Sequence, residues 1–407
     1  MRNITPTFMS LTSALLLSTA AMADDTPPPA APAAAAPAAP AAPAAPAFQL
    51  GMDGPITINP TPYTVSSGSA LGTIIINGAV SGIAMAQDHH VSGDHSGWGD
   101  ISSAQVLIEK TDGPLQFFVD AGSYSFPALG TPYTRSDKAT SATFGAVPVA
   151  FLKWVPTGAF SVQVGKLPTL IGAEYNYTFE NTNIERGLLW NQENQVARGI
   201  QANYTYGPVL FNLSLNDGFY SGKYSYVTGA ATWTIDGSNT LELSGGGNTK
   251  TTTVSNSATP VFLNNSSMIN LIWTHTQGPW TFQPYYQYTS VPSVSALKSS
   301  GASTSGAAVF IDYAFPSTSP LTGVSLPVRV EYITSKANAS NSPSLLYGPG
   351  SNAWSFTFTP TYQWKIYYVR AEFSYTNAGS LTAGDGFGVL GTAKSQSRGL
   401  LETGVLF

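Results

Sequence analysis

The sequence predicts an all-β protein: a transmembrane, antiparallel up-and-down β-barrel of about 16 strands, with short periplasmic turns and long external loops. Three observations predict this fold. An N-terminal export signal precedes the rest of the chain, and segments of about ten residues then repeat with alternating polarity. The chain also ends at Phe407, inside a segment, 399–407, whose side chains divide between two faces of a strand.

Residues 1–23 have the pattern of a signal peptide. Arg2 gives the positive start, the run from 11 to 21 is apolar, and Ala21-Met22-Ala23 is a small-x-small cleavage site. The apolar run is too short, and too rich in Ser and Thr, to span a membrane as a helix. We therefore expect cleavage near Ala23 and a mature chain that begins near Asp24.

Residues 24–70 form an expected periplasmic tether. From 26 to 47 the sequence consists almost entirely of Pro and Ala. Proline at this density interrupts helices and cannot donate to a sheet, which leaves an extended, polyproline-like spacer. Two interpretations stay open: an inert linker, or a spacer that contacts the cell-wall layer.

Residues 71–407 are predicted to form the barrel. Short breaks, such as Gly207-Pro208 and Gln277–Pro279, alternate with long ones, such as 122–141 and 245–262. The strands are therefore predicted to form hairpins. Short turns are expected at the periplasmic end of the barrel, and long loops at the external end. The strand count is about 16, with 14 or 18 as alternatives because boundaries are the weakest predictions. An even count places the tether and Phe407 on the same side.

Composition agrees with one lipid-facing and one wet surface. Only 10% of residues are charged, against about 25% in ordinary soluble domains, and 12% are aromatic. Segment 209–216 alternates Val, Phe and Leu with Asn and Ser, and 351–361 alternates aromatic residues with Ser and Thr. A formal net charge of −5 argues against a nucleic-acid partner. The absence of cysteine excludes thiol chemistry, disulfides and thiolate metal sites.

Two segments carry an Arg-x-Glu pattern between apolar residues. Arg329 and Glu331 share one face of 328–332, and Arg370 and Glu372 share one face of 369–373. An Arg facing lipid near the bilayer midplane costs about 2–4 kcal/mol, so these side chains should point into the lumen. They are candidates for pore-lining residues that set ion selectivity, or for an internal salt-bridge ladder that stiffens the wall.

The segment 167–196 is long for a structureless loop and is rich in charge. We interpret it as an element that folds in and narrows the pore, with a solvated external loop as the alternative. Its candidate constriction residues, together with the Arg that opens the next strand, are Glu174, Glu180, Glu185, Arg186, Glu193 and Arg198.

A family resemblance is carried by four stretches in this region. They are Phe160-Ser-Val-Gln-Val-Gly-Lys166, Thr169-Leu-Ile-Gly-Ala-Glu174, Asn183-Ile-Glu-Arg-Gly187 and Arg198-Gly-Ile-Gln-Ala-Asn-Tyr204. Together they resemble the conserved middle of the β-barrel porin-2, or OmpL-like, family. The resemblance implies a porin-type barrel in the bacterial outer membrane. It supplies no catalytic or ligand motif, so Lys166, Glu174 and Arg186 match without an assigned role.

The histidines offer little support for an enzyme. His89, His90 and His95 share one polar loop, which reads as an exposed loop or, less favoured, as a divalent-metal site. His275 stands between two threonines without a local nucleophile or orienting carboxylate. We expect no enzyme activity and no cofactor.

These observations together lead us to expect passive diffusion of small hydrophilic solutes or ions through a water-filled barrel. The expected partners are outer-membrane lipid, the barrel-insertion machinery that recognises a last strand ending in Phe407, and the solutes themselves. Whether the chain forms a homo-oligomer stays open. The alternatives are a structural or adhesive barrel with a blocked lumen and, with less support, a barrel hydrolase that uses His275.

Overall fold

The computed structural model describes residues 62–66, 72–254, 259–337, 339 and 341–407. The expected signal peptide, and nearly all of the expected tether, lie outside these residues. Within them the fold is almost entirely β-structure. No helix of the described residues is long and apolar enough to cross a membrane.

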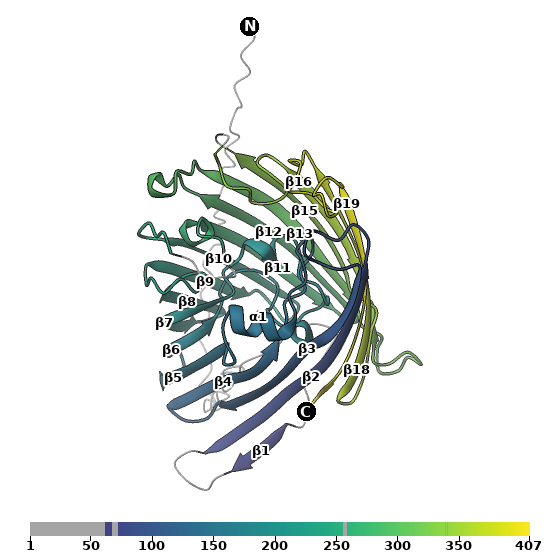
Figure 1. Ribbon diagram of the computed structural model, residues 1–407. Helices are drawn as coiled ribbons and strands as arrows, with labels where there is room; N and C mark the ends of the chain where they lie inside the picture. Colours follow the sequence, from purple (N-terminus) through teal and green to yellow (C-terminus); the bar gives the residue numbers. More distant parts are fainter. Residues whose placement is uncertain (1–61, 67–71, 255–258, 338, 340) are drawn as a thin grey trace, which may run out of the picture. The chain divides into compact units, whose positions relative to one another are not determined.

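The strands follow each other around a single curved sheet (Figure 1). They are β1 (Tyr63–Ser66), β2 (Thr73–Gln87), β3 (Gly97–Lys110), β4 (Leu115–Tyr124), β5 (Val149–Thr157), β6 (Phe160–Pro168), β7 (Val196–Tyr206), β8 (Val209–Asn216), β9 (Tyr226–Thr234), β10 (Asn239–Asn248), β11 (Ser267–Gln277), β12 (Trp280–Val291), β13 (Ala302–Tyr313), β14 (Val324–Ser325), β15 (Val328–Ala337), β16 (Asn352–Phe358), β17 (Thr361–Trp364), β18 (Tyr367–Gly379) and β19 (Ser395–Leu406). The helices are α1 (Ser136–Ala142) and four single 3₁₀ turns, η1 (Thr178–Glu180), η2 (Trp190–Gln192), η3 (Leu263–Asn265) and η4 (Ser295–Leu297).

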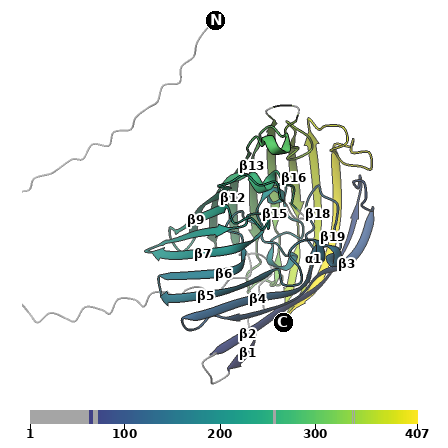
Figure 2. The ribbon, with the colours of Figure 1, turned by 60° about the vertical axis from the view of Figure 1, so that its left-hand side comes forward.

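All the pairings are antiparallel, most of them join strands that follow each other in the chain, and β19 pairs with β2 to close the barrel. Around the two short strands, β13 pairs with β15, β14 with β17, and β16 with β18. Figure 2 shows β4 to β7 side by side in chain order. Two spans are each interrupted at a proline. Leu326-Pro327 separates β14 from β15, and Thr359-Pro360 separates β16 from β17, because proline has no N–H to give to the ladder. Counting each interrupted pair once gives a closed barrel of 16 strands, with β1 as a short addition to β2, which confirms the predicted fold class.

The two faces of the wall differ as the alternating pattern predicts. On β8, Leu213 and Leu215 are exposed, whereas Ser214 and Asn216 are buried inside. On β16, Trp354 and Phe356 are exposed, and Ser355 and the other inward positions are buried. The apolar positions therefore form the outer surface of the barrel, and the Ser, Thr and Asn positions face the interior.

The last residue completes the closure. The Phe407 N–H donates to the Gly78 carbonyl at 3.0 Å, and the Gly78 N–H donates to the Phe407 carbonyl at 2.8 Å. A Cβ at Gly78 would stand 2.2 Å from the Phe407 ring, so this position needs the smallest residue. As the alternation predicts, Leu400 and Leu406 face inward, and both are buried.

Candidate functional site

The connection between β6 and β7 folds into the barrel. Its side chains between Glu174 and Asn194 are nearly all buried, and it contains η1 and η2. It is held by strands far later in the chain: the Leu188 N–H donates to Glu331, 143 residues on, and Gln287 donates to the Leu189 carbonyl from 98 residues on. We call residues 169–195 the inserted segment. This arrangement matches the folded-in alternative for the segment, and excludes a solvated external loop.

On β15, Arg329 and Glu331 hold the middle of the inserted segment. Arg329 Nη1 donates to Glu174 Oε1 at 2.6 Å and to the Glu185 carbonyl at 2.7 Å. Glu331 accepts hydrogen bonds from the Leu188 N–H at 3.1 Å and from Ser355 Oγ at 2.7 Å. A single Arg-x-Glu pair thus contacts both side chains and backbone of the segment.

On β18, Arg370 and Glu372 hold the first half of the segment in the same manner. Glu372 accepts from the Ile184 N–H at 2.6 Å and from the Glu185 N–H at 2.9 Å. Arg370 donates to the Thr178 carbonyl at 2.6 Å and also pairs with Glu402 of β19. The neighbouring Arg398 pairs with Glu185 at 2.6 Å.

The four predicted wall residues therefore face inward, as the cost of placing charge in lipid requires. They are covered by protein, however, and Arg329 and Arg370 have no exposed surface. They do not border open space in this structure, because the inserted segment lies on top of them. Sequence reasoning missed this cover, since no local signal links 169–195 to strands β15, β18 and β19.

The six constriction candidates occupy five different environments. Glu174 and Glu180 reach the cavity described below, and Glu185 lies in the network with Arg398. Arg186 is buried, donates to the Ile184 carbonyl at 2.8 Å and faces the Trp190 ring at 5.8 Å. Glu193 is buried beside the Tyr285 hydroxyl, and Arg198 pairs with Asp217 at 2.7 Å, at the start of β7.

Burial also changes the acidity of the segment's carboxyl groups. The pKa of Glu180 and that of Glu193 are raised well above the ordinary value, mainly because burial penalises the charged form. The nearby Asp120 adds to the rise for Glu180, and Glu174 and Glu331 add to the rise for Glu193. These two groups therefore favour the protonated form in the folded barrel.

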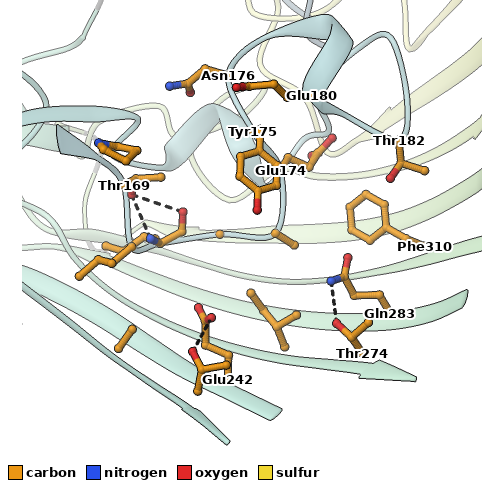
Figure 3. Close-up of a pocket in the computed structure, with 18 of the residues that line it drawn as sticks. Thr169, Glu174, Tyr175, Asn176, Glu180, Thr182, Glu242, Thr274, Gln283 and Phe310 are labelled. Atoms are coloured by element: carbon orange, nitrogen blue, oxygen red, sulfur yellow. Dashed lines mark hydrogen bonds between the residues drawn. The ribbon is translucent and has the colours of Figure 1, made fainter. Parts of the chain in front are cut away.

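A cavity of about 520 Å³ remains between the inserted segment and the opposite part of the wall (Figure 3). The wall side is built by β4, β5 and β8 to β13, and most of its lining is polar or small. Thr232 donates to Glu242 at 3.0 Å, and Gln283 donates to Thr274 at 2.8 Å, so neighbouring strands are linked across the lining. The acidic lining residues are Asp120, Glu174, Glu180, Glu242 and Asp312.

Sequence reasoning missed Asp120, Glu242 and Asp312. Each stands in a strand with apolar or small neighbours, as in Leu241-Glu242-Leu243 and Ile311-Asp312-Tyr313. A carboxylate flanked by outward-facing apolar residues should point inward for the same reason as Arg329, because a charge facing lipid is costly. The signal was therefore present, but it is a single charge and not a repeated Arg-x-Glu pattern.

The histidines do not assemble a second site. His89 lies 3.5 Å from Asp88 in the connection after β2, and no group of three or more His, Cys, Asp or Glu in the described parts of the chain could hold a metal. His275 lies near the turn between β11 and β12, where its Nδ1 is 2.8 Å from the Asn239 amide oxygen. That contact supplies neither a nucleophile nor an orienting carboxylate.

Comparison with known proteins agrees with the geometry. The family model described as "Putative beta-barrel porin-2, OmpL-like" matches residues 73–407. Outer-membrane expressed OmpT of Vibrio cholerae is similar in structure, with a TM-score of 0.53 and 14% identity over 85% of this chain and 100% of that one. An in-vitro folded, trimer form of OmpT from Vibrio cholerae gives a TM-score of 0.52 and 13% identity, over 82% of this chain and 99% of that one. No curated protein sequence that was compared matches the chain. At these identities the structural matches establish the barrel fold alone.

Proposed function

Because the chain belongs to the β-barrel porin-2, OmpL-like family and so is a porin-type outer-membrane barrel, we propose that small hydrophilic solutes and ions diffuse passively through its interior. The observation that carries this proposal is the cavity of about 520 Å³ beside the inserted segment, whose lining includes five carboxylates. A closed barrel with a polar interior and an element folded against one side leaves a narrowed route along the other side. We expect no catalytic activity.

In this proposal the inserted segment sets the size limit. The charged residues of β15, β18 and β19 act as its anchors, with Arg329 and Arg370 donating to its backbone and side chains. Glu174 and Glu180 reach the remaining space from the segment side. The assignment differs from the expected one, in which Arg329, Glu331, Arg370 and Glu372 touch the permeating ions directly.

Planar-bilayer recording of the purified, refolded protein tests the proposal. We expect discrete conductance steps in potassium chloride, because a water-filled route carries ions. Liposome swelling with sugars of increasing size should show a cut-off, since the inserted segment narrows the route. Bilayers that take up the folded barrel but show no steps would contradict passive diffusion.

The near-complete burial of the inserted segment favours one second candidate, a structural or adhesive barrel with a blocked lumen. The same recording separates the two, because a blocked barrel inserts without conducting. Binding of the long loops to a surface would then be the activity to measure.

The remaining proposals concern export and assembly. We propose that residues 1–23 are removed near Ala23, that 24–70 form a periplasmic tether, and that 71–407 form the barrel. The strand ending in Phe407 would be the part read by the barrel-insertion machinery, with outer-membrane lipid around the finished wall. A homo-oligomer is a further proposal, supported by the trimer form of the structurally similar OmpT. N-terminal sequencing of the mature protein and crosslinking in membranes test these points.

A further inference from the structure

We propose that the route through this barrel selects cations over anions, with the unpaired carboxylates around the cavity as the selecting groups. The inference rests on the proposed diffusion function and adds the class of solute that the route prefers. It follows from the positions of the interior charges: carboxylates line the cavity, whereas the basic side chains lie outside its lining.

The basic side chains of the interior lie outside the lining of the cavity. Arg329, Arg370 and Arg398 are buried under or beside the inserted segment, and each pairs with a glutamate. Lys166 is also engaged away from the cavity, where it donates to the carbonyls of Phe144 and Val147. Among the described residues that line the cavity, none is Lys or Arg.

The acidic side chains distribute differently. Of the five carboxylates that line the cavity, Glu174 is neutralised by Arg329 at 2.6 Å. The other four make no ion pair within the part of the chain that the structure describes. They come from four different elements: Asp120 from β4, Glu180 from η1, Glu242 from β10 and Asp312 from β13.

Asp312 supports the assignment independently of the distribution of ion pairs. It points inward from β13, only 8% of it is exposed, and it lines the cavity. Its Oδ1 atom has no hydrogen-bond partner in the structure. A buried carboxylate oxygen without a donor is costly, so a cation or its water shell is the partner that its chemistry calls for.

Carboxylates that surround a narrow space attract cations and repel anions, and low-dielectric walls strengthen the effect. Thr232 Oγ1 already orients Glu242 across the sheet, so its side chain is held at the lining. Arg329, Arg370 and Arg398 do not neutralise the cavity carboxylates that lack an ion pair, because each of these arginines is paired with another glutamate. Burial favours the neutral form of Glu180, so the negative charge that a permeating ion meets comes from the other unpaired carboxylates, Asp120, Glu242 and Asp312.

The test is the reversal potential of single channels in a potassium chloride gradient. We expect a sign that reports cation preference for the wild-type protein. Substituting Glu242→Gln together with Asp312→Asn removes two of the four unpaired carboxylates, so the potassium-to-chloride permeability ratio should fall by roughly twofold or more. The control pair Asp137→Asn and Asp385→Asn removes the same charge from exposed positions outside the lining, on α1 and in the connection after β18, and should leave the ratio unchanged.

The possible results separate the two proposals. No conductance at all contradicts diffusion itself. Conductance with a reversal potential at zero, or with anion preference, leaves diffusion intact and overturns the cation assignment. An unchanged ratio in the cavity pair, or an equal fall in the control pair, removes these carboxylates from selection. The wild-type reversal potential alone can overturn the inference. The test therefore remains decisive even if the variant does not fold.

Discussion

At the scale of single residues, the interior depends on buried charges that are satisfied by one another. Arg329 contacts Glu174, Glu331 and the Glu185 carbonyl without any exposed surface. Gly187 stands beside this group, and a Cβ there would come within 2.1 Å of the Glu331 carboxylate. Such a network tolerates little change, because removing one partner leaves its neighbours buried and uncompensated.

Arg329→Gln is therefore expected to loosen the inserted segment. Loss of the guanidinium leaves Glu174 and Glu331 without their cation, at a cost of about 3–5 kcal/mol. We expect a lower temperature for loss of the folded band on heated gels and noisier conductance. Arg198→Gln is the matched control, since Arg198 is about a third exposed and its pair with Asp217 lies at the edge of the segment. Equal effects of both substitutions would contradict the anchoring role.

Glu193→Gln tests the protonation state of the segment. Burial raises the pKa of Glu193 in the folded barrel above that of the unfolded chain. The stabilisation from its protonated form is therefore fully present at low pH and is lost as the pH rises through the raised pKa. We expect wild-type channels to grow noisier, and the folded band to become less heat-resistant, as the pH increases from acid.

In Glu193→Gln, whose amide resembles the protonated carboxyl, this component of the pH dependence should disappear. Asp137→Asn, at an exposed position on α1, should retain it. A variant whose heat resistance follows pH as steeply as the wild type would show that other groups control the segment.

At the scale of elements, the inserted segment is the part that makes this barrel different from an empty tube. Its fold is irregular, with two single 3₁₀ turns in the part that the structure describes, and side chains of the wall bond to several of its backbone groups. Irregular backbone at membrane depth is stable only where protein or water satisfies it. The charged positions of β15 and β18 supply that satisfaction.

Replacing residues 175–192 by a short Gly-Ser linker should widen the route. We expect higher single-channel conductance and a larger sugar cut-off, because the element that fills one side of the lumen is gone. The four wall charges would then meet water, so ion preference should change as well. A barrel with the same conductance and cut-off as the wild type would show that the segment does not limit passage.

At the scale of the whole molecule, the sequence was sufficient for the outer architecture and insufficient for the interior. Alternation on strands such as β8 and β16 predicted the faces, and the length of segment 167–196 favoured an inserted element. The hydrogen bond from the Ile184 N–H to Glu372 joins positions 188 apart, and no local sequence pattern in either segment predicts it. Contacts across the lumen depend on which strands face each other once the barrel has closed. The alternating pattern predicts the number of strands, but it does not predict which inward side chains meet the inserted segment.

That closure also yields a prediction for the last residue. Phe407 contributes two backbone hydrogen bonds to Gly78 and a ring that rests against the same glycine. Phe407→Ala keeps the backbone bonds and removes the ring, whereas deletion of Phe407 removes both. In folding experiments with purified protein and lipid, we expect Phe407→Ala to fold with a small loss of heat resistance and the deletion to lose more. In cells, under the proposal that the insertion machinery reads this strand, Phe407→Ala should already reduce the amount of barrel in the outer membrane strongly. If the cellular loss only parallels the loss of heat resistance in lipid, the ring serves closure alone and recognition of the terminal aromatic is contradicted.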